Sequence, residues 1–367
     1  MEIKKAIISG GGTGGHIFPA VAIADQLKKE FPHIELLFIG AEGKMEMEKV
    51  PAAGYTIIGL PIRGFQRRLT ASNLLLPFKI IQSLLKARKI IKDFNPDVVI
   101  GVGGYASGPT LKIAGMLGIP TVIQEQNSFA GKTNVLLAKN AKKICVAYEN
   151  MEQFFPKDKI VFTGNPVREN VVKIQDKRAK GLDYFQLDPS KKTLLVVGGS
   201  LGARTLNNSV KAHIETLQKE GIQVIWQTGK LQYAQLKEDL KDKNLDGISL
   251  NEFITQMDYA YAAADVIISR AGAIAVSELC LIGKPMILVP SPNVAEDHQT
   301  KNALALVTKN AALLVKDANA VQELIPSAIA LLKNNEEQEL LSQNCIKMGV
   351  ANAAERIVDT IKSLLKP

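Results

Sequence analysis

A run of glycines near the N-terminus contains the first residues whose types and spacing could do chemistry. The segment Gly10–Gly15 has the G-x-G-x-x-G spacing and lies between a strand expected at Lys5–Ser9 and a helix expected at Phe18–Lys29. Glycine lets a phosphate approach the backbone, and the unpaired N–H groups at a helix start attract an anion. The segment therefore indicates a phosphate-binding loop, and a tight strand-to-helix turn without a ligand is the structural alternative.

His16 follows this loop directly, at the expected start of the helix. A lone histidine is most often a hydrogen-bonded structural residue, but the dipole of a helix N-terminus disfavours an imidazolium and keeps the ring available as a base. We therefore interpret His16 as a candidate general base. Glu42 leaves an alternative open, because an acid after the second strand is where an NAD-dependent dehydrogenase using the Gly10–Gly15 loop would bind a ribose.

A second glycine loop opens the C-terminal half of the chain in the same way. Gly198–Arg204 follows a strand expected at Thr193–Val197 and offers backbone donors, the Ser200 hydroxyl and one guanidinium, which suit a diphosphate. The loop lacks the Lys-Ser/Thr ending of a P-loop, so ATP hydrolysis is not expected.

Two further helix starts carry polar residues that could bind a ligand. Ser269–Ala273 ends an expected strand, and Glu278 lies one turn into the helix expected at Ile274–Ile282. That carboxylate either complements the helix dipole or bridges two ribose hydroxyls. Asp297–Asn302 opens another helix, whose polar residues are caps or, as for Gln299, could bind sugar hydroxyls.

Metal and cofactor chemistry has little support in the sequence. There is no Asp-x-Asp pair, which disfavours a transferase that holds its nucleotide through a metal ion. The three cysteines, Cys145, Cys280 and Cys345, are far apart and offer neither a disulfide framework nor a zinc site. We therefore expect no metal and no cofactor.

The strongest concentration of positive charge lies in residues 63–92, which we call the basic block. It contains no acid, and Leu74–Leu76 with Phe78 exceed one buried helical stripe, so some of these side chains should be exposed. That pattern is typical of a helix on an anionic membrane surface; a solvated helix face is the ordinary alternative. Nucleic acid is disfavoured because only 5% of the residues are aromatic. The residues expected to contact the membrane are Arg67, Arg68, Leu75, Leu76, Phe78, Lys79, Lys86, Arg88 and Lys89.

The elements that position these residues alternate between strands and helices, which predicts an α/β fold with parallel sheets. The two glycine loops indicate two doubly wound domains that face each other across a cleft: residues 1–165, and residues 166–349 after a linker that begins near Thr163–Arg168. The polar stretch up to about Ser190 is expected to belong to that linker. The expected strands are Lys5–Ser9, Glu35–Ile39, Thr56–Leu60, Val98–Val102, Thr121–Gln124, Lys143–Ala147, Ile160–Phe162, Thr193–Val197, Val224–Gln227, Ile248–Asn251, Val266–Ser269, Pro285–Val289 and Ala312–Val315.

Length and composition agree with this organisation. The chain has 367 residues, of which 46% are hydrophobic and 22% charged, as in ordinary globular proteins of two domains. Of the net charge of +9, the first 165 residues carry +8 and the rest +1, so the first domain is the one expected to meet an anionic surface. No run of 18 apolar residues and no signal-peptide pattern occurs, so a cytoplasmic location is expected.

Seven segments together resemble the MurG family of bacterial peptidoglycan glycosyltransferases. In chain order they are Gly10–Pro19, Gly101–Pro109, Gln124–Asn127, Gly164–Arg168, Gly198–Asn207, Ser269–Glu278 and His298–Ala303. The resemblance implies a two-domain GT-B fold, UDP-N-acetylglucosamine as donor, the membrane-bound muramyl acceptor lipid I, and inversion at the anomeric carbon. It also implies attachment to the anionic cytoplasmic leaflet, a C-terminal helix at 350–367 that packs back on the first domain, and other cell-wall synthesis proteins as possible partners.

The same resemblance implies roles for individual residues. His16 becomes the catalytic base for the acceptor hydroxyl, and Gly12, Gly103, Gly104 and Tyr105 become acceptor-binding residues. His298 stands where some family members have a second glutamine. The implied donor-binding residues are Thr13, Gly14, Gly15, Asn127, Arg168, Ser200, Phe253, Ile254, Arg270, Ala273, Glu278, His298 and Gln299, with Phe253 and Ile254 at the uracil and Glu278 at the ribose.

Overall fold

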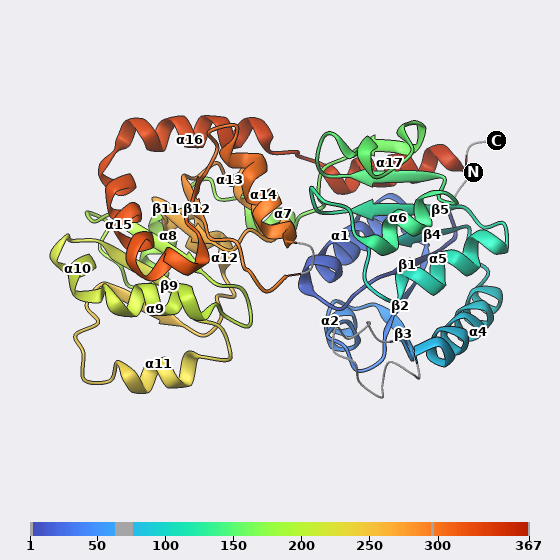
Figure 1. The fold of residues 1–367 in the computed structure, drawn as a ribbon, viewed down its shortest axis with the longest axis horizontal. Coiled ribbons are helices and arrows are strands. Elements are labelled where there is room, and N and C mark those ends of the chain that lie inside the picture. Colours follow the sequence, from blue (N-terminus) through green and yellow to red (C-terminus); the bar gives the residue numbers. More distant parts are fainter. Residues whose placement is uncertain (1–2, 63–75, 295–296, 366–367) are drawn as a thin grey trace. The chain divides into compact units, whose positions relative to one another are not determined.

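The computed structural model describes residues 3–62, 76–294 and 297–365 (Figure 1). The chain forms two compact units. Unit 1 is Met1–Val167 with Val350–Pro367, and unit 2 is Arg168–Gly349. Each unit is built around one parallel β-sheet with helices packed on it, which confirms the expected α/β class.

The sheet of unit 1 has the strand order β3-β2-β1-β4-β5-β6-β7, and all of its neighbouring strands are parallel. Successive residues of its central strand enter different cores: Ile7 packs in one hydrophobic cluster, and Ala6 and Ile8 in another. Both faces are therefore covered, which explains the continuous apolar runs of these strands. The strands are β1 (Lys5–Ser9), β2 (Glu35–Ala41), β3 (Thr56–Leu60), β4 (Val98–Gly101), β5 (Thr121–Glu125), β6 (Lys143–Val146) and β7 (Ile160–Phe162).

The described helices of unit 1 connect these strands, and the C-terminal helix joins them. In α17, Ile357, Val358 and Ile361 are buried in the same cluster as Ile17 and Leu27 of α1, so the end of the chain completes the core of unit 1. The helices are α1 (Gly14–Glu30), α2 (Glu46–Ala52), α4 (Leu76–Phe94), α5 (Ser107–Met116), α6 (Lys132–Ala138), η1 (Met151–Gln153), η2 (Lys157–Lys159) and α17 (Ala353–Leu364).

Unit 2 repeats the architecture with the strand order β10-β9-β8-β11-β12-β13. Its strands are β8 (Thr193–Val197), β9 (Gln223–Gln227), β10 (Ile248–Asn251), β11 (Val266–Ser269), β12 (Met286–Leu288) and β13 (Leu313–Leu314). Its described helices are α7 (Glu169–Val172), α8 (Arg178–Tyr184), α9 (Arg204–Ala212), α10 (Ile214–Lys219), α11 (Tyr233–Asp239), α12 (Met257–Ala263), α13 (Ala273–Ile282), α14 (His298–Val307), η4 (Asp317–Asn319), α15 (Ala320–Lys333) and α16 (Asn335–Met348).

Apart from shifts of one or two residues at strand ends, two local expectations differ from the structure. The first helix begins at Gly14, four residues before the expected start, so Gly15 and His16 lie within its first turn and Thr13 is its N-cap. The polar stretch expected to be a linker up to Ser190 contains α7 and α8, and α8 packs on α12 inside unit 2. Short amphipathic helices in that stretch lack strong periodicity, which is why composition alone suggested a linker.

Candidate functional site

The carboxyl ends of β1 and β4 carry two glycine loops that pack directly against each other. The Gly11 N–H donates to the Gly103 carbonyl oxygen over 3.3 Å. A Cβ at Gly104 would lie only 2.4 Å from the Gly11 carbonyl oxygen, so this approach requires glycine. The strand order reverses between β1 and β4, the position at which doubly wound sheets bind ligands. Gly12–Gly15 and Gly103–Tyr105 therefore lie together at the ligand-binding edge of unit 1.

His16 lies in the first turn of α1, at the same edge of the sheet. Its Nδ1 is 2.9 Å from the Gly11 carbonyl oxygen. A carbonyl oxygen can only accept, so Nδ1 carries the proton of the neutral ring and Nε2 is left as an acceptor. The Nε2 atom faces the second glycine loop, since a Cβ at Gly103 would lie 2.9 Å from it. This is the tautomer that a general base acting through Nε2 requires.

Glu46, the first residue of α2, is a feature of this site that the sequence analysis missed. Its side chain is buried, Oε2 accepts from the Gly12 N–H at 2.8 Å, and Oε1 accepts from the Ala41 N–H at 3.0 Å. An acid in the first turn of a helix ordinarily only complements the helix dipole. No local pattern shows that this carboxylate reaches a loop 34 residues earlier in the chain.

Asn127 is held at the end of β5 by another buried carboxylate that the sequence analysis did not single out. Glu125 Oε1 accepts from the backbone N–H and the side-chain amide of Asn127, at 3.1 and 3.3 Å. Its Oε2 accepts from the Gly131 N–H at 3.0 Å and from the Asn134 amide at 2.8 Å. Four donors thus satisfy one carboxylate, which fixes the loop after β5 and the backbone of Asn127 at the same sheet edge.

Unit 2 has a pocket of about 440 Å³ at the carboxyl ends of β8 and β11, where its strand order reverses. The starts of α9, α13 and α14 contribute to its wall, so partial positive charges of helix N-termini converge on it. Such a pocket suits a diphosphate. Its polar lining includes Arg204, Thr205, Ser269, Arg270, Ser291, Asn293, Gln299 and Asp317.

Two of the predicted donor residues, Arg270 and Gln299, line this pocket, and both are held by neighbours. The Arg270 guanidinium pairs with Asp317 at 2.5 Å and donates to the Val289 carbonyl at 3.0 Å. The Gln299 side-chain oxygen accepts from the Ser291 N–H at 2.8 Å. Three other predicted residues occupy the same loops and helix starts: Ser200 is exposed in the glycine loop, Ala273 is the first residue of α13, and His298 is the first residue of α14.

Glu278 lies in a second cluster of unit 2, outside the lining of this pocket. It is 7% exposed, Tyr261 donates to Oε2 at 3.3 Å, and the Arg168 guanidinium is 3.9 Å from Oε1. Burial raises the pKa of Glu278, while Arg168 and the Tyr261 hydrogen bond lower it. The structure thus brings together the predicted residues Arg168, at the start of unit 2, and Glu278, in α13.

Phe253 and Ile254 follow β10, and a glutamine that sequence analysis missed ties them to the glycine loop. Gln227 is buried; its side-chain oxygen accepts from the Ile254 N–H at 3.0 Å, and its amide donates to the Gly199 carbonyl at 3.1 Å. Ile254 packs in the core, whereas Phe253 is 55% exposed. An exposed ring near this glycine loop is available to stack on a base.

The basic block is described only in part. Arg63, Arg67, Arg68, Leu74 and Leu75 lie outside the described residues, as does the side chain of Leu76. Along α4, Ser83, Ala87 and Ile91 face the core, whereas Phe78, Ile81 and Leu85 are 69%, 56% and 65% exposed. Lys86 pairs with Glu42 at 2.8 Å, Lys79 is half-buried, and Arg88, Lys89 and Lys92 are exposed.

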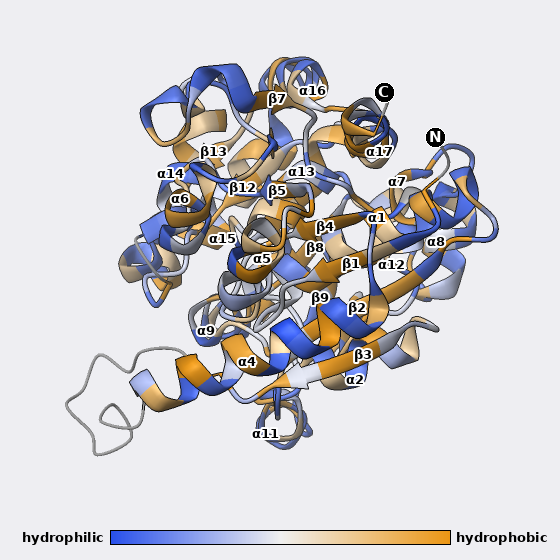
Figure 2. Cartoon of the chain, turned by 90° about the vertical axis from the view of Figure 1, so that its right-hand side faces the viewer, coloured by the Kyte–Doolittle hydropathy of each residue, from blue (hydrophilic) through white to orange (hydrophobic). Residues whose placement is uncertain are grey.

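Helix α4 therefore presents an apolar ridge followed by a basic end; Figure 2 shows hydrophobic and hydrophilic residues alternating along it. Among residues 3–62, 76–294 and 297–365, no helix is both long and apolar enough to cross a bilayer.

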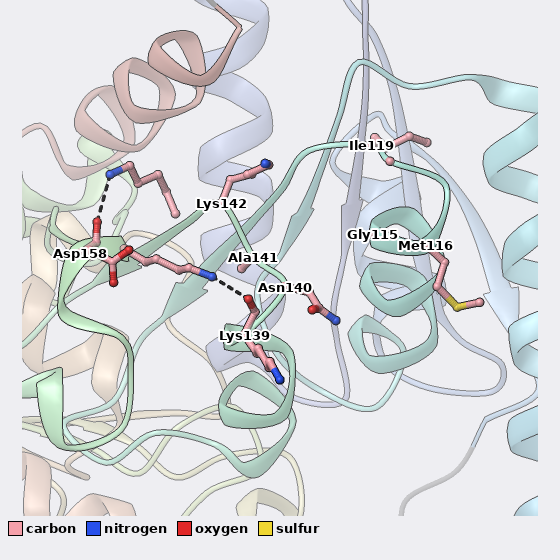
Figure 3. A pocket seen from close by; sticks show the side chains of 11 residues that line it. Gly115, Met116, Ile119, Lys139, Asn140, Ala141, Lys142 and Asp158 are labelled. Carbon is pink, nitrogen blue, oxygen red and sulfur yellow. Dashed lines mark hydrogen bonds between the residues drawn. The ribbon is translucent and has the colours of Figure 1, made fainter.

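A pocket of about 590 Å³ in unit 1 lies away from the glycine loops (Figure 3). It is lined by segments that lead into β5, β6 and β7, at the amino ends of these strands. Two of its lysines are engaged with backbone carbonyls: Lys159 donates to Lys139 at 2.6 Å, and Lys143 donates to Asp158 at 3.3 Å. These contacts satisfy carbonyl groups at the end of α6 and in η2, which explains these two lysines without a ligand.

Comparison with known proteins identifies matching family models and relatives of high sequence identity. Two family models match: the Glycosyltransferase family 28 N-terminal domain over residues 6–146, and the Glycosyltransferase family 28 C-terminal domain over residues 193–357. A protein of Parabacteroides distasonis is 55% identical over 365 residues, covering 100% of this chain and 99% of the relative. A protein of Phocaeicola vulgatus is 56% identical over 364 residues, covering 99% and 97%. Both are named UDP-N-acetylglucosamine–N-acetylmuramyl-(pentapeptide) pyrophosphoryl-undecaprenol N-acetylglucosamine transferase.

Among solved structures, the crystal structure of Acinetobacter baumannii MurG has a TM-score of 0.77 and 30% sequence identity. The match covers 98% of this chain and 99% of that one. The likeness therefore extends over both units.

Proposed function

The chain belongs to glycosyltransferase family 28, and from that premise we propose that it transfers N-acetylglucosamine from UDP-N-acetylglucosamine to lipid I, N-acetylmuramyl-(pentapeptide) pyrophosphoryl-undecaprenol. The observation that carries this conclusion is 55% identity along the whole chain with a relative of that name. The protein is a UDP-N-acetylglucosamine-dependent hexosyltransferase of peptidoglycan synthesis with a GT-B-like fold. The dehydrogenase alternative is not supported, because the family models that match are those of glycosyltransferases.

We propose that unit 2 holds most of the donor. The pocket at the starts of α9 and α13 would take the diphosphate, whose negative charge is complemented by helix N-termini without a metal ion. The exposed ring of Phe253, beside Ile254, would stack on the uracil, and Glu278 would accept hydrogen bonds from the ribose. The other residues proposed to contact sugar or phosphate are Thr13, Gly14, Gly15, Asn127, Arg168, Ser200, Arg270, Ala273, His298 and Gln299.

The chemical step that we propose is a single displacement. His16 Nε2 takes the proton from the 4-hydroxyl of the muramyl sugar as that oxygen bonds to C1 of N-acetylglucosamine. The bond between C1 and the diphosphate oxygen breaks, the configuration at C1 inverts, and UDP leaves with its charge stabilised by the helix starts of unit 2. Gly12, Gly103, Gly104 and Tyr105, at the edge that carries His16, would bind the acceptor diphosphate.

We propose that α4 and the basic block bring unit 1 to the anionic cytoplasmic leaflet, where the lipid-linked acceptor resides. The ridge of Phe78, Ile81 and Leu85 would insert among the headgroups, and the exposed Arg88 and Lys89 would meet anionic lipid. Other cell-wall synthesis proteins are compatible partners at the same membrane.

Transfer of labelled sugar tests the activity directly. Purified protein is incubated with UDP-[14C]-N-acetylglucosamine and lipid I in vesicles, with and without EDTA, and the lipid fraction is counted. We expect labelled product in both samples. Release of free labelled sugar without lipid product would contradict the transferase, and activity lost in EDTA but restored by magnesium would contradict the metal-independent account of the diphosphate.

A further inference from the structure

The carboxylate of Glu46 is buried, and a buried charge requires stabilising interactions. The residue is 1% exposed, and its carboxylate oxygens bond to the N–H groups of Gly12 and Ala41. Neither of these partners is a cation, so no ion pair offsets the burial of the charge at these two bonds. Burying an ionised carboxylate is costly unless hydrogen bonds satisfy it. We therefore consider the role of Glu46 in terms of the backbone groups that it binds.

The surroundings of Glu46 are shaped to admit this carboxylate. A Cβ at Gly11 would lie 2.3 Å from its carboxyl carbon, and a Cβ at Gly40 would lie 2.6 Å from its Cγ. Contacts that short do not occur, so any side chain at either position would displace Glu46. One glycine of the N-terminal loop thus makes room for a protein carboxylate rather than for a ligand phosphate.

One peptide group joins this carboxylate to the imidazole. The N–H of Gly12 and the carbonyl of Gly11 belong to the same planar amide. Its N–H donates to Glu46 Oε2 at 2.8 Å, and its carbonyl oxygen is 2.9 Å from His16 Nδ1. An amide that donates to a carboxylate becomes a stronger acceptor at its carbonyl, because hydrogen bonds in a chain polarise one another.

We propose that Glu46 is a positioning residue that acts on His16 through this peptide group. By fixing the Gly11–Gly12 amide, it holds the proton on Nδ1 and leaves Nε2 as the acceptor. As the ring takes a proton at Nε2, the positive charge that develops is stabilised by the polarised carbonyl. The inference rests on the proposed role of His16 as general base, and Glu46 itself touches no substrate.

The substitution Glu46→Gln tests this arrangement with little change in shape. In glutamine an NH2 group replaces one of the two carboxylate oxygens, so in the same position either the Gly12 or the Ala41 N–H group loses its acceptor, and the remaining bond is to a neutral amide and no longer to a charged carboxylate. The matched control is Glu48→Gln, which removes an exposed carboxylate from the same helix. Turnover is measured with UDP-N-acetylglucosamine and a soluble lipid I analogue, and donor affinity by calorimetry. The tautomer of His16 is determined by NMR from the ¹⁵N chemical shifts of its imidazole ring. The His16 signals are identified as those that disappear in His16→Gln.

For Glu46→Gln we expect kcat to fall about 10- to 100-fold, as for a displaced catalytic group, with donor Kd within about twofold of wild type. The Nδ1–H tautomer of His16 should lose population, and Glu48→Gln should match wild type throughout. Equal kcat in the two folded variants would overturn the proposal. If Glu46→Gln does not fold, the wild-type spectrum decides, since an Nε2–H tautomer excludes the arrangement and an Nδ1–H tautomer supports it. Near-wild-type turnover in His16→Ala would instead refute the role of His16 as general base. This result differs from the result that would refute the positioning role of Glu46.

Discussion

The exposed face of α4 supports a quantitative prediction for membrane binding. Phe78, Ile81 and Leu85 are each more than half exposed, on the face opposite Ser83, Ala87 and Ile91. Full burial of such an apolar side chain contributes about 1.5–3 kcal/mol, so the exposed portions offer about 1–2 kcal/mol each and about 3–6 kcal/mol together. Replacing all three with serine should weaken vesicle binding about 100-fold or more, since each 1.4 kcal/mol is a factor of ten.

The basic end of the same helix contributes a separate, salt-dependent part. Arg88, Lys89 and Lys92 are exposed, whereas the charge of Lys86 is already opposed by Glu42. At about 1 kcal/mol per basic residue near an anionic surface, reversing these three to glutamate should weaken binding at least about 100-fold at low salt. The loss should shrink in high salt, where the screening length is about 3 Å at 1 M.

Sedimentation with vesicles that contain or lack anionic lipid measures both effects. The matched controls are Met116→Ser with Leu136→Ser, two exposed apolar residues of unit 1, and reversal of Lys112, Lys139 and Lys142, three exposed lysines of the same unit. Both controls should bind as wild type. The α4 variants should lose activity on lipid I but keep it on a short soluble acceptor. Binding that ignores lipid charge, or an equal loss in the controls, would refute this account of α4.

Four further predictions concern residues of the transfer site. His16→Ala should lower turnover about 10²–10⁴-fold while UDP affinity measured by calorimetry stays near wild type; near-wild-type turnover in the folded variant contradicts this. Glu278→Ala should cost about 1.5–3 kcal/mol of UDP binding, and an unchanged affinity would leave Glu278 with a structural role. Because burial raises the pKa of Glu278, the folded state binds its proton more tightly than the unfolded state does. The free energy of unfolding of wild type, relative to Glu278→Gln, should therefore fall as pH rises from about 4.5 through the raised pKa, as denaturant titration can measure. Arg270→Ala should weaken UDP binding by leaving Asp317 unopposed in the pocket, and adding Asp317→Asn should restore much of the affinity; no recovery in the double variant contradicts the charge argument.

The strands could be predicted because a buried parallel strand is a continuous run of apolar residues in the sequence. Parallel strands covered on both faces must be apolar throughout, and β1, β3, β7, β8, β10 and β11 have the expected bounds, while the others differ by one or two residues at an end. The helix ends were harder. α1 begins inside the glycine run, with Thr13 as its extended N-cap, although glycine is a poor helix former.

The residues that support the site were not predictable, for a common physical reason. Glu46 and Gln227 bond to backbone groups in loops that are distant in the sequence. Glu125 bonds to loop residues nearer to it, among them Asn127 two residues later. Composition and periodicity report how a segment is buried, but not which distant N–H group a buried carboxylate meets. A buried polar residue next to a strand end was the available signal, since such groups require partners.

The charges in the unit 2 pocket show how a diphosphate would be held there. Arg270 is one of the donor-binding residues that the sequence resemblance implies, yet Asp317 lies 2.5 Å from its guanidinium and also accepts from Thr205 at 3.0 Å. Arg270 and Asp317 together carry little net charge, so the pair attracts an anion only weakly. Its role is to fix the positions of the segments that follow β11 and β13. The attraction must then come mainly from the converging starts of α9 and α13 and from Arg204, which is exposed at the first position of α9. Backbone dipoles are fixed before a ligand arrives, so in the proposed reaction they would stabilise the growing charge on UDP without reorganising as the C1–O bond breaks.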